Sequence, residues 1–357
     1  MNNIKFSIIN SNLTTPTPEE IEVNNKDYVL FGSDNKYPEV LLNCYNDCGI
    51  LSSIINSITD YVSAGGTDIE DFAVNKDETL NELIKKITLD YIIFGAFTIQ
   101  LLRNKKGEIC EIHYVDVNKC RLSKDNKFVY YSSKGWDRYT RNVAKYDRFN
   151  KNLNSNNSIM YYKNAKSSRT TYALPIWNSA LKDILTLIDI TNFHYSSLNN
   201  NFMPSCSISF NNGVPSEEEQ EIIEQRIKEK FCGTDNASKF LLSFSDNKDN
   251  APVIERIAYD DFADRYNSLR ENAINNIFAT FRASEKLFGI NETNNGFSTE
   301  EFKSIFLLFK TQVIQPIQIE IERAFGQIGI DFMLNEFVID FEDSDNEVNN
   351  DHNKIGF

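Results

Sequence analysis

The sequence contains few of the residues and motifs on which common enzymes and membrane proteins depend. Its 357 residues include only three histidines, and none of the patterns G-x-x-x-x-G-K-[ST], G-x-S-x-G or H-E-x-x-H occurs. Nucleotide-driven motors, serine hydrolases of the nucleophile-elbow type and zinc proteases are therefore excluded. No apolar run approaches the ~20 residues that a membrane span requires. We expect a non-enzymatic protein with no cofactor, no metal and no bilayer segment.

The sequence has few cysteines, and their spacing does not indicate disulfide bonds. The six cysteines are scattered, and no secretory segment begins the chain, so we expect a reducing compartment and no disulfides. Cys44 and Cys48 have the i, i+4 spacing that could hold a metal, but neither His113 nor His194 belongs to a second ligand pair. Two buried, small apolar side chains are the better interpretation of this cysteine pair, and the two histidines are expected to be structural.

An excess of positive charge is also absent. Lys and Arg number 37 against 51 Asp and Glu, which gives a formal net charge of -14. Tight binding of nucleic acid depends on cations that displace counterions from phosphates, so gripping DNA is not the expected main function. An acidic or neutral wall would still let a duplex slide past it. On charge alone, an ordinary acidic protein is the simpler interpretation.

What the chain does contain is enough apolar material for a large core and a mixture of helix and strand patterns. Hydrophobic residues make up 41%, with 26 Phe and 16 Tyr, and the length exceeds one typical domain. Apolar spacing predicts one helix from Tyr37 to Gly65, possibly broken at Gly49, and a second over 79–94. Alternation then predicts strands over 97–103, 109–122, 128–131 and 159–162, preceded by short strands at 4–9 and 27–31, with a polar loop over 134–157.

The second half is dominated by long helices. One is predicted from Pro175 to Asn201, with proline at its start, and another over 260–283 that buries Phe262, Tyr266, Leu269, Ala273, Ile277 and Phe281. Between them, strands are expected at 205–210, 239–244 and 253–257, with a helix to Phe231 that a Ser216/Glu219 capping box begins. The last helix, over 299–325, is N-capped by Ser298 and must bend at Pro316.

Four collinear segments resemble the HK97-type family of tailed-bacteriophage portal proteins. Phe281, Leu287 and Gly289 match the family pattern F-x-V-P-P-x-L-x-G, although Ser284 and Glu285 replace its two prolines. The block from Tyr91 to Ile109 is similar to Y-x-x-x-G-N-A-F…L-x-R…G-x-I, with Ala96 in place of Asn. The long helix after Pro175 and the bent helix with Pro316 occur in the family's order. Each motif is short, and the order of the four carries the resemblance.

The resemblance implies an α+β portal fold, divided along the chain. The expected parts are an α/β wing at 1–170, a first stem helix at 171–201, a small α/β clip at 202–257, a second stem helix at 258–284, a tunnel loop at 285–297, a kinked helix returning to the wing at 298–329, and a short strand with a polar tail at 330–357. Two long antiparallel helices joined by a compact insert suit a ring closed by head-to-tail contacts.

The same resemblance implies a function in the virion. The chain would form a homo-oligomeric ring, typically a dodecamer, at one capsid vertex and conduct double-stranded DNA during packaging and ejection. Implied partners are the major capsid protein, the terminase large subunit and the head–tail adaptor, with assembly in the bacterial cytoplasm. The tunnel loop would face DNA through Lys286, Asn291, Asn294 and Asn295, and the clip would present Glu217, Glu218 and Glu221 for docking.

Simpler interpretations stay open for each of these residues. Lys286 is by itself a solvated lysine, the asparagines follow from a chain rich in Asn, and the acidic run stabilises its own helix N-terminus. Trp177 is expected in the core or a subunit interface. The alternative function is a non-enzymatic helical protein that binds nucleic acid through the basic and aromatic segment 134–148.

Overall fold

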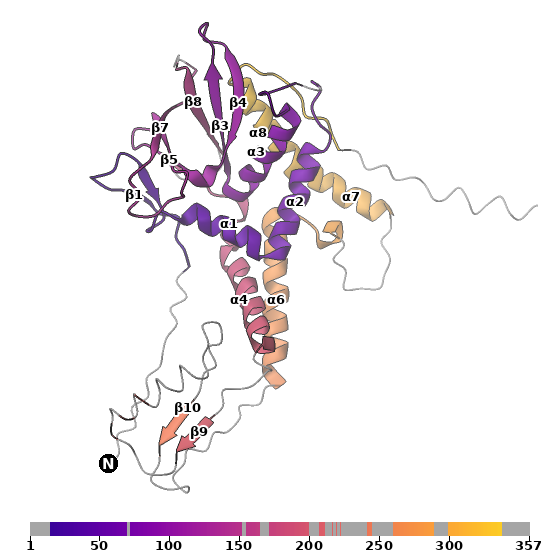
Figure 1. The fold of residues 1–357 in the computed structure, drawn as a ribbon. Helices are drawn as coiled ribbons and strands as arrows, with labels where there is room; N and C mark the ends of the chain where they lie inside the picture. Colours follow the sequence, from indigo (N-terminus) through magenta and orange to yellow (C-terminus); the bar gives the residue numbers. More distant parts are fainter. Residues whose placement is uncertain are drawn as a thin grey trace, which may run out of the picture. The chain divides into compact units, whose positions relative to one another are not determined.

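A computed structural model describes residues 15–69, 72–151, 155–164, 171–199, 207–210, 216, 219, 222, 241–244, 260–288 and 299–337 of the chain. The chain divides into two compact units. Unit 1 comprises Met1–Lys182 and Asn276–Phe357, and unit 2 comprises Asp183–Asn275. Helices and strands both occur in the described residues, so the predicted α+β class is confirmed (Figure 1).

A six-stranded sheet forms the centre of unit 1. Its strand order is β4-β3-β8-β7-β6-β5, and all neighbours are antiparallel except β7 and β8. The strands are β3 (Ala96–Arg103), β4 (Ile109–Val115), β5 (Cys120–Leu122), β6 (Phe128–Tyr131), β7 (Ala144–Arg148) and β8 (Asn157–Lys163). A separate two-stranded sheet pairs β1 (Glu20–Glu22) with β2 (Val29–Phe31).

Three helices of the N-terminal half belong to unit 1. They are α1 (Tyr37–Asp47), α2 (Gly49–Ser63) and α3 (Leu80–Phe94), and α3 packs on this sheet at β3 and β4 while the other two helices pack on α3. Thr79 and Glu82 cap the start of α3 reciprocally, and Gly95 ends it in the left-handed conformation with φ +74. A Cβ atom at Gly95 would lie 2.4 Å from the carbonyl oxygen of Leu174. Only glycine therefore allows the helix to turn directly into β3.

Two predictions for this half need correction, and one alternative is confirmed. The helix expected over 37–65, possibly broken at Gly49, is broken there into α1 and α2, because Cys48 takes an extended conformation between them. The strand expected over 109–122 is interrupted by a 3₁₀ turn at Val117–Lys119, which the Asp116 side chain caps. The stretch 134–157, expected to be a loop, contributes β7 to the sheet because its backbone pairs with β6 and β8. The predicted strand at 4–9 lies outside the described residues.

Unit 2 contains most of two helices and a small sheet. The helices are α4 (Leu181–Asn199) and α6 (Asp260–Phe281), and within the unit the ring of Phe193 stacks on that of Tyr266 with centroids 5.6 Å apart. The strands β9 (Ser207–Phe210) and β10 (Leu241–Phe244) pair in parallel, as two of the three predicted strands. The third, at 253–257, lies outside the described residues.

The predicted helix boundaries in this part are close but not identical. The helix expected from Pro175 begins as a 3₁₀ helix, Ile176–Ala180, and becomes α-helical at Leu181. The capping box is confirmed, since the amide of Glu219 donates to Ser216 Oγ at 3.4 Å and that of Ser216 to Glu219 Oε2 at 3.1 Å.

The burial predicted along α6 holds only towards its end. Leu269 was expected to be buried and is instead 52% exposed, because the whole turn 267–270 is exposed. Tyr266 is half-buried, and the side chain of Phe262 lies outside the described residues. Apolar spacing identified the helix, but it could not show which of its turns the chain itself covers.

The C-terminal helix of unit 1 bends as predicted, through an unexpected device. It consists of α7 (Thr299–Phe309), a π-helical turn at Lys310–Ile314 and α8 (Gln315–Gly326). Pro316 has no N–H, and its ring conflicts with the carbonyl of residue 312, so the wider π turn accommodates it. Among the described residues, no helix is long and apolar enough to cross a membrane.

Candidate functional site

The segment with the strongest family pattern runs from the end of α6 through α8. The last turns of α6 bury Ala273, Ile277 and Phe281, which confirms these three predictions. Phe281 is fully enclosed, as expected for the aromatic residue that opens the family pattern. The segment is therefore anchored in unit 1 before its variable part begins.

Arg282 ends α6 in an unusual conformation. Its φ is +54, the amide of Arg282 donates to Ala279 O, and the amide of Ala283 donates to Phe278 O at 3.0 Å. These bonds form a Schellman motif, in which glycine usually occupies the left-handed position. A left-handed arginine costs about 1–2 kcal/mol. The motif supplies the helix end that Ser284 and Glu285, in place of two prolines, left uncertain.

The start of the predicted tunnel loop is ordered by packing. Glu285–Phe288 form a 3₁₀ helix, η4, with Leu287 buried. The ring of Phe288 lies 5.5 Å from that of Phe278 and 6.3 Å from that of Phe309, which ties η4 to both α6 and α7. The described part of the predicted tunnel loop is therefore held by packing against two helices.

The structure describes only part of the predicted site. Lys286 lies on η4 and forms an ion pair with Glu301 of α7, so its charge is partly compensated within the chain. Asn291, Asn294 and Asn295 lie outside the described residues, as do Glu217, Glu218 and Glu221. Their predicted roles stay predictions.

The π turn is held from the other side by the segment after α8. The carboxylate of Glu336 accepts from Lys310 Nζ at 2.6 Å and from Gln315 Nε2 at 3.0 Å. The bond from Lys310 is the main reason why the pKa of Glu336 is lowered. Both ends of the π turn are thus bridged by one side chain.

An open cavity of about 440 Å³ lies where α3, the 3₁₀ helix before α4, the end of α6 and the π turn meet. We call it the junction cavity. Its lining includes Leu174, Pro175, Ile176, Arg282 and Val313. Tyr91 and Glu320 also line it, and burial, with the nearby Glu320 carboxylate, raises the pKa of Tyr91. Sequence reasoning did not identify Arg282 as a site residue, and only its place after the helix in the family pattern could have drawn attention to it.

The alternative site, the basic and aromatic segment 134–148, is largely used by the fold. Trp136 is 5% exposed, and its ring meets that of Tyr28 at 4.9 Å and the guanidinium of Arg121 at 5.0 Å. The Arg148 guanidinium donates to Asn126 Oδ1 and to Tyr161 O, and burial lowers its pKa. The tryptophan is not available to stack on a base.

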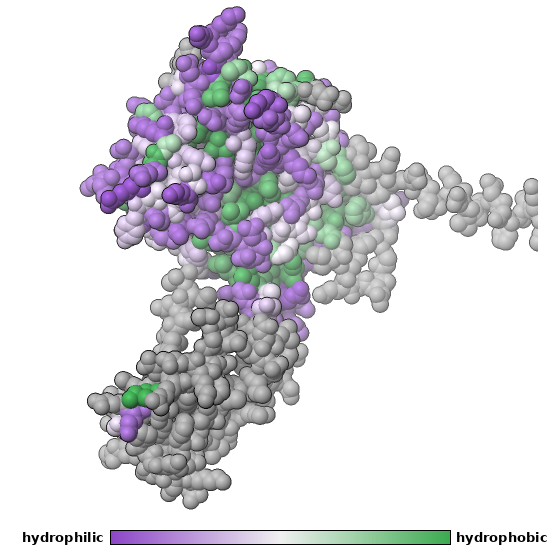
Figure 2. All heavy atoms as spheres, viewed as in Figure 1, coloured by the Kyte–Doolittle hydropathy of each residue, from purple (hydrophilic) through white to green (hydrophobic). Residues whose placement is uncertain are grey.

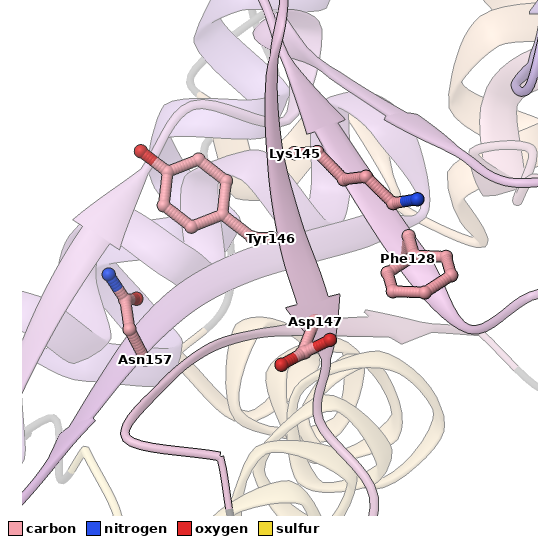
Figure 3. A pocket seen from close by; sticks show the side chains of 5 residues that line it. All are labelled: Phe128, Lys145, Tyr146, Asp147 and Asn157. Carbon is pink, nitrogen blue, oxygen red and sulfur yellow. The ribbon is translucent and has the colours of Figure 1, made fainter.

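A shallow hollow of about 300 Å³ lies on the sheet beside the same segment (Figure 3). It is lined by Phe128, Lys145, Tyr146, Asp147 and Asn157. Lys145 and Tyr146 project to opposite sides of β7, and the ammonium of Lys145 lies 3.7 Å from the ring centroid of Phe128. One lysine and one aspartate in an open hollow do not make an acid–base or nucleophilic site.

No metal site is found in the part of the chain that the structure describes: no three His, Cys, Asp or Glu side chains form a suitable group. Cys44 and Cys48 are free and buried, as predicted, and burial raises the pKa of Cys44 to about 12. Trp177 is also in the core, as one of its two predicted locations, where its Nε1 donates to Ile92 O at 3.0 Å.

Comparison with known proteins agrees with this description. Residues 71–345 match the family described as phage portal protein. Among solved structures, the chain is similar to one from the virion of a native gene transfer agent particle, with 14% identity, a TM-score of 0.54 and 84% of each chain covered. A chain from the neck of an empty gene transfer agent particle gives 13% identity, a TM-score of 0.53 and 84% of each chain.

A third similar structure is an HK97 family phage portal protein from Corynebacterium diphtheriae, with 10% identity, a TM-score of 0.43, and 79% of this chain and 88% of that chain covered. No curated protein matches the chain. The family match spans more than half of the sequence and includes the block from Tyr91, both long helices and the bent helix. The chain belongs to the phage portal protein family, whose members are structural components of the virion and serve as conduits for DNA.

Proposed function

We propose that this chain assembles into a closed ring of twelve copies at one capsid vertex and conducts double-stranded DNA during packaging and ejection. The family match over residues 71–345 is the observation that carries this proposal. Because the sequence contains no nucleotide-binding motif, the energy for DNA movement must come from a partner. The terminase large subunit during packaging, and the head–tail adaptor afterwards, are the proposed partners, with the major capsid protein around the ring and assembly in the bacterial cytoplasm.

The proposed division of labour follows the order of elements. Residues 1–170 would be the wing, 171–201 and 258–284 the stem helices, 202–257 the clip, 285–297 the tunnel loop, 298–329 the kinked helix and 330–357 the terminal strand and tail. The clip would dock partners through Glu217, Glu218 and Glu221. In the tunnel loop, Lys286 and the three asparagines would meet DNA.

The paired charge of Lys286 supports a sliding contact. A lysine that is already paired with Glu301 displaces fewer counterions from a passing DNA phosphate than an unpaired lysine would, and therefore binds that phosphate more weakly. A chain with a net charge of -14 offers little additional attraction. The expected wall is one that guides DNA and does not hold it.

Electron microscopy of the purified full chain tests the proposal. We expect rings with a central hole, whose rotational symmetry gives the number of copies directly. A monodisperse monomer at every concentration and salt tried would overturn the ring. Salt-sensitive DNA binding by the isolated chain would instead support the alternative through the exposed cations of 134–148.

A further inference from the structure

Helix α7 exposes an apolar pair that no other described part of the chain covers. Leu307 is 62% and Leu308 59% exposed, whereas Phe306 and Phe309 on either side are buried. Glu300 lies on the same exposed face, seven and eight residues before the two leucines. Its carboxylate has no ion-pair partner among the described residues. We call Glu300, Leu307 and Leu308 the α7 ridge.

The junction cavity has the complementary chemistry. Leu174, Pro175, Val313 and the 41% exposed Ile176 provide apolar walls. Arg282 lines the same cavity, is exposed, and has no ion-pair partner within the described part of the chain. The cavity volume is in the range of pockets that bind small-molecule ligands, so a few side chains of a partner protein would fit inside it. A pair of apolar side chains next to a carboxylate would fit this cavity, because the apolar side chains would contact its walls and the carboxylate would pair with Arg282.

The backbone of Arg282 indicates that its side chain has a use. Glycine adopts a positive φ at little cost and is the usual residue at this place in a Schellman motif. Arginine at φ +54 is strained. Strain of this kind persists where the surrounding structure holds the backbone in place, and it clusters at functional sites. A guanidinium held at the edge of an apolar cavity is suited to a carboxylate.

A ring requires two different surfaces that fit one another on successive copies. The α7 ridge and the junction cavity belong to unit 1, and the described residues leave both of them open. We therefore propose, resting on the proposed ring, that the α7 ridge of one copy enters the junction cavity of the next copy. Leu307 and Leu308 pack against its apolar walls, and Glu300 pairs with Arg282 of the neighbouring copy. The second copy is preferred over an unrelated peptide because ridge and cavity match in both polarity and charge. Glu320, the carboxylate that also lines the cavity, is paired with Arg323 at 2.7 Å, which leaves the Arg282 guanidinium for Glu300.

Charge exchange tests the pair. Arg282→Glu and Glu300→Arg are each expected to raise the concentration at half assembly by about tenfold or more, as measured by mass photometry, since close interfacial charge pairs couple by more than ~1.4 kcal/mol. The double variant should return to within about threefold of the wild type. Arg138→Glu, at an exposed cation outside both surfaces, controls for net charge and should leave assembly unchanged. Additive losses in the double variant would overturn the pairing.

A cross-link tests the apolar contact between copies. Leu308→Cys and Ile176→Cys are prepared separately in a Cys110→Ser background, since Cys110 is exposed, and then mixed and treated with a short bis-maleimide. We expect covalent dimers from the mixture in clear excess over either variant alone. Rings in the microscope without this excess would overturn the inference and leave the proposed function intact. A wild type that forms no rings would overturn the proposed function itself.

Discussion

Two regions of the molecule bury their side chains to different extents. One is the six-stranded sheet with the helices α1, α2 and α3, which we call the sheet body, or the body, and the other is the pair of long helices in unit 2. In the body, even charged groups are enclosed: Arg121 is 1% and Asp90 5% exposed. In unit 2, Phe193, Tyr195 and Leu269 are each more than half exposed. On the face shown in Figure 2, hydrophilic residues cover much of the surface, with several apolar areas between them. The sheet and the helices packed on it enclose even their charged groups, whereas the long helices of unit 2, like the α7 ridge of unit 1, carry exposed apolar side chains.

The largest expected loss comes from the buried guanidinium. Arg121 donates to Asn35 Oδ1 at 2.7 Å and to the carbonyls of Asn35, Asn118 and Cys120. Arg121→Ala should lower the free energy of unfolding by about 3–5 kcal/mol, because several buried acceptors lose their donor. Urea denaturation measures the loss. Arg138→Ala, at an exposed arginine, is the control, and an equal effect of the two would show that the body is not internally satisfied.

A smaller but substantial loss is expected at the turn between α3 and β3. Gly95→Ala should destabilise unit 1 by roughly 1–3 kcal/mol, because φ is positive and the new Cβ would meet the carbonyl of Leu174. Gly135→Ala is a matched control, since Gly135 also has positive φ but a Cβ added there would meet no atom within 4 Å. The difference in melting temperature between the two variants isolates the steric conflict.

A gain is expected at Asp90. Burial raises the pKa of its carboxyl, Asp116 adds to the rise, and bonds from Tyr114 Oη and the Val117 amide only partly oppose it. Asp90→Asn should therefore stabilise the protein near pH 7, on the order of 1 kcal/mol. As the pH falls through the raised folded pKa, the wild type binds a proton before the unfolded chain does and gains stability. The advantage of the variant should shrink on acidification and vanish below about pH 4, as urea denaturation at several pH values would show.

The smallest effect on folding is expected in unit 2. Leu269→Ser should change the free energy of unfolding by less than about 0.5 kcal/mol in the monomer, because the side chain is already exposed. Ala273→Ser, one turn further along the same helix at a buried position, should cost more. Equal effects in thermal denaturation would contradict the distinction between the exposed and the buried turns of α6.

Local signals in the sequence predicted the parts of the fold that depend on local physics. Thr79 with Glu82, and Ser216 with Glu219, identified two helix starts from their side-chain chemistry. Pro316 identified the bend, but no local rule distinguishes a kink from a π turn, which depends on how α8 packs. Gly49 indicated a possible break between α1 and α2, but the apolar spacing on both sides suits one continuous helix, so the sequence left both possibilities open.

The candidate site depended on contacts between distant residues, and the sequence predicted less of it. Trp136 looked like part of a surface that binds nucleic acid because its neighbours are basic, yet Tyr28 and Arg121 enclose it. Lys286 was recognised as a cation, but its partner Glu301 is 15 residues away. Arg282 could not be distinguished from other surface arginines until its φ and the cavity beside it were known.

The one extra residue in the π turn between α7 and α8 determines which side of α7 faces outward. An α-helix turns about 100° per residue, and a π turn holds one more residue than the α turn it replaces. Deleting one residue from Lys310–Ile314 and restoring the regular helix would rotate α7 by about that angle relative to α8. The leucine pair would turn away from its present direction, and a different side of α7 would face outward. A one-residue length change here is therefore equivalent to replacing an entire surface.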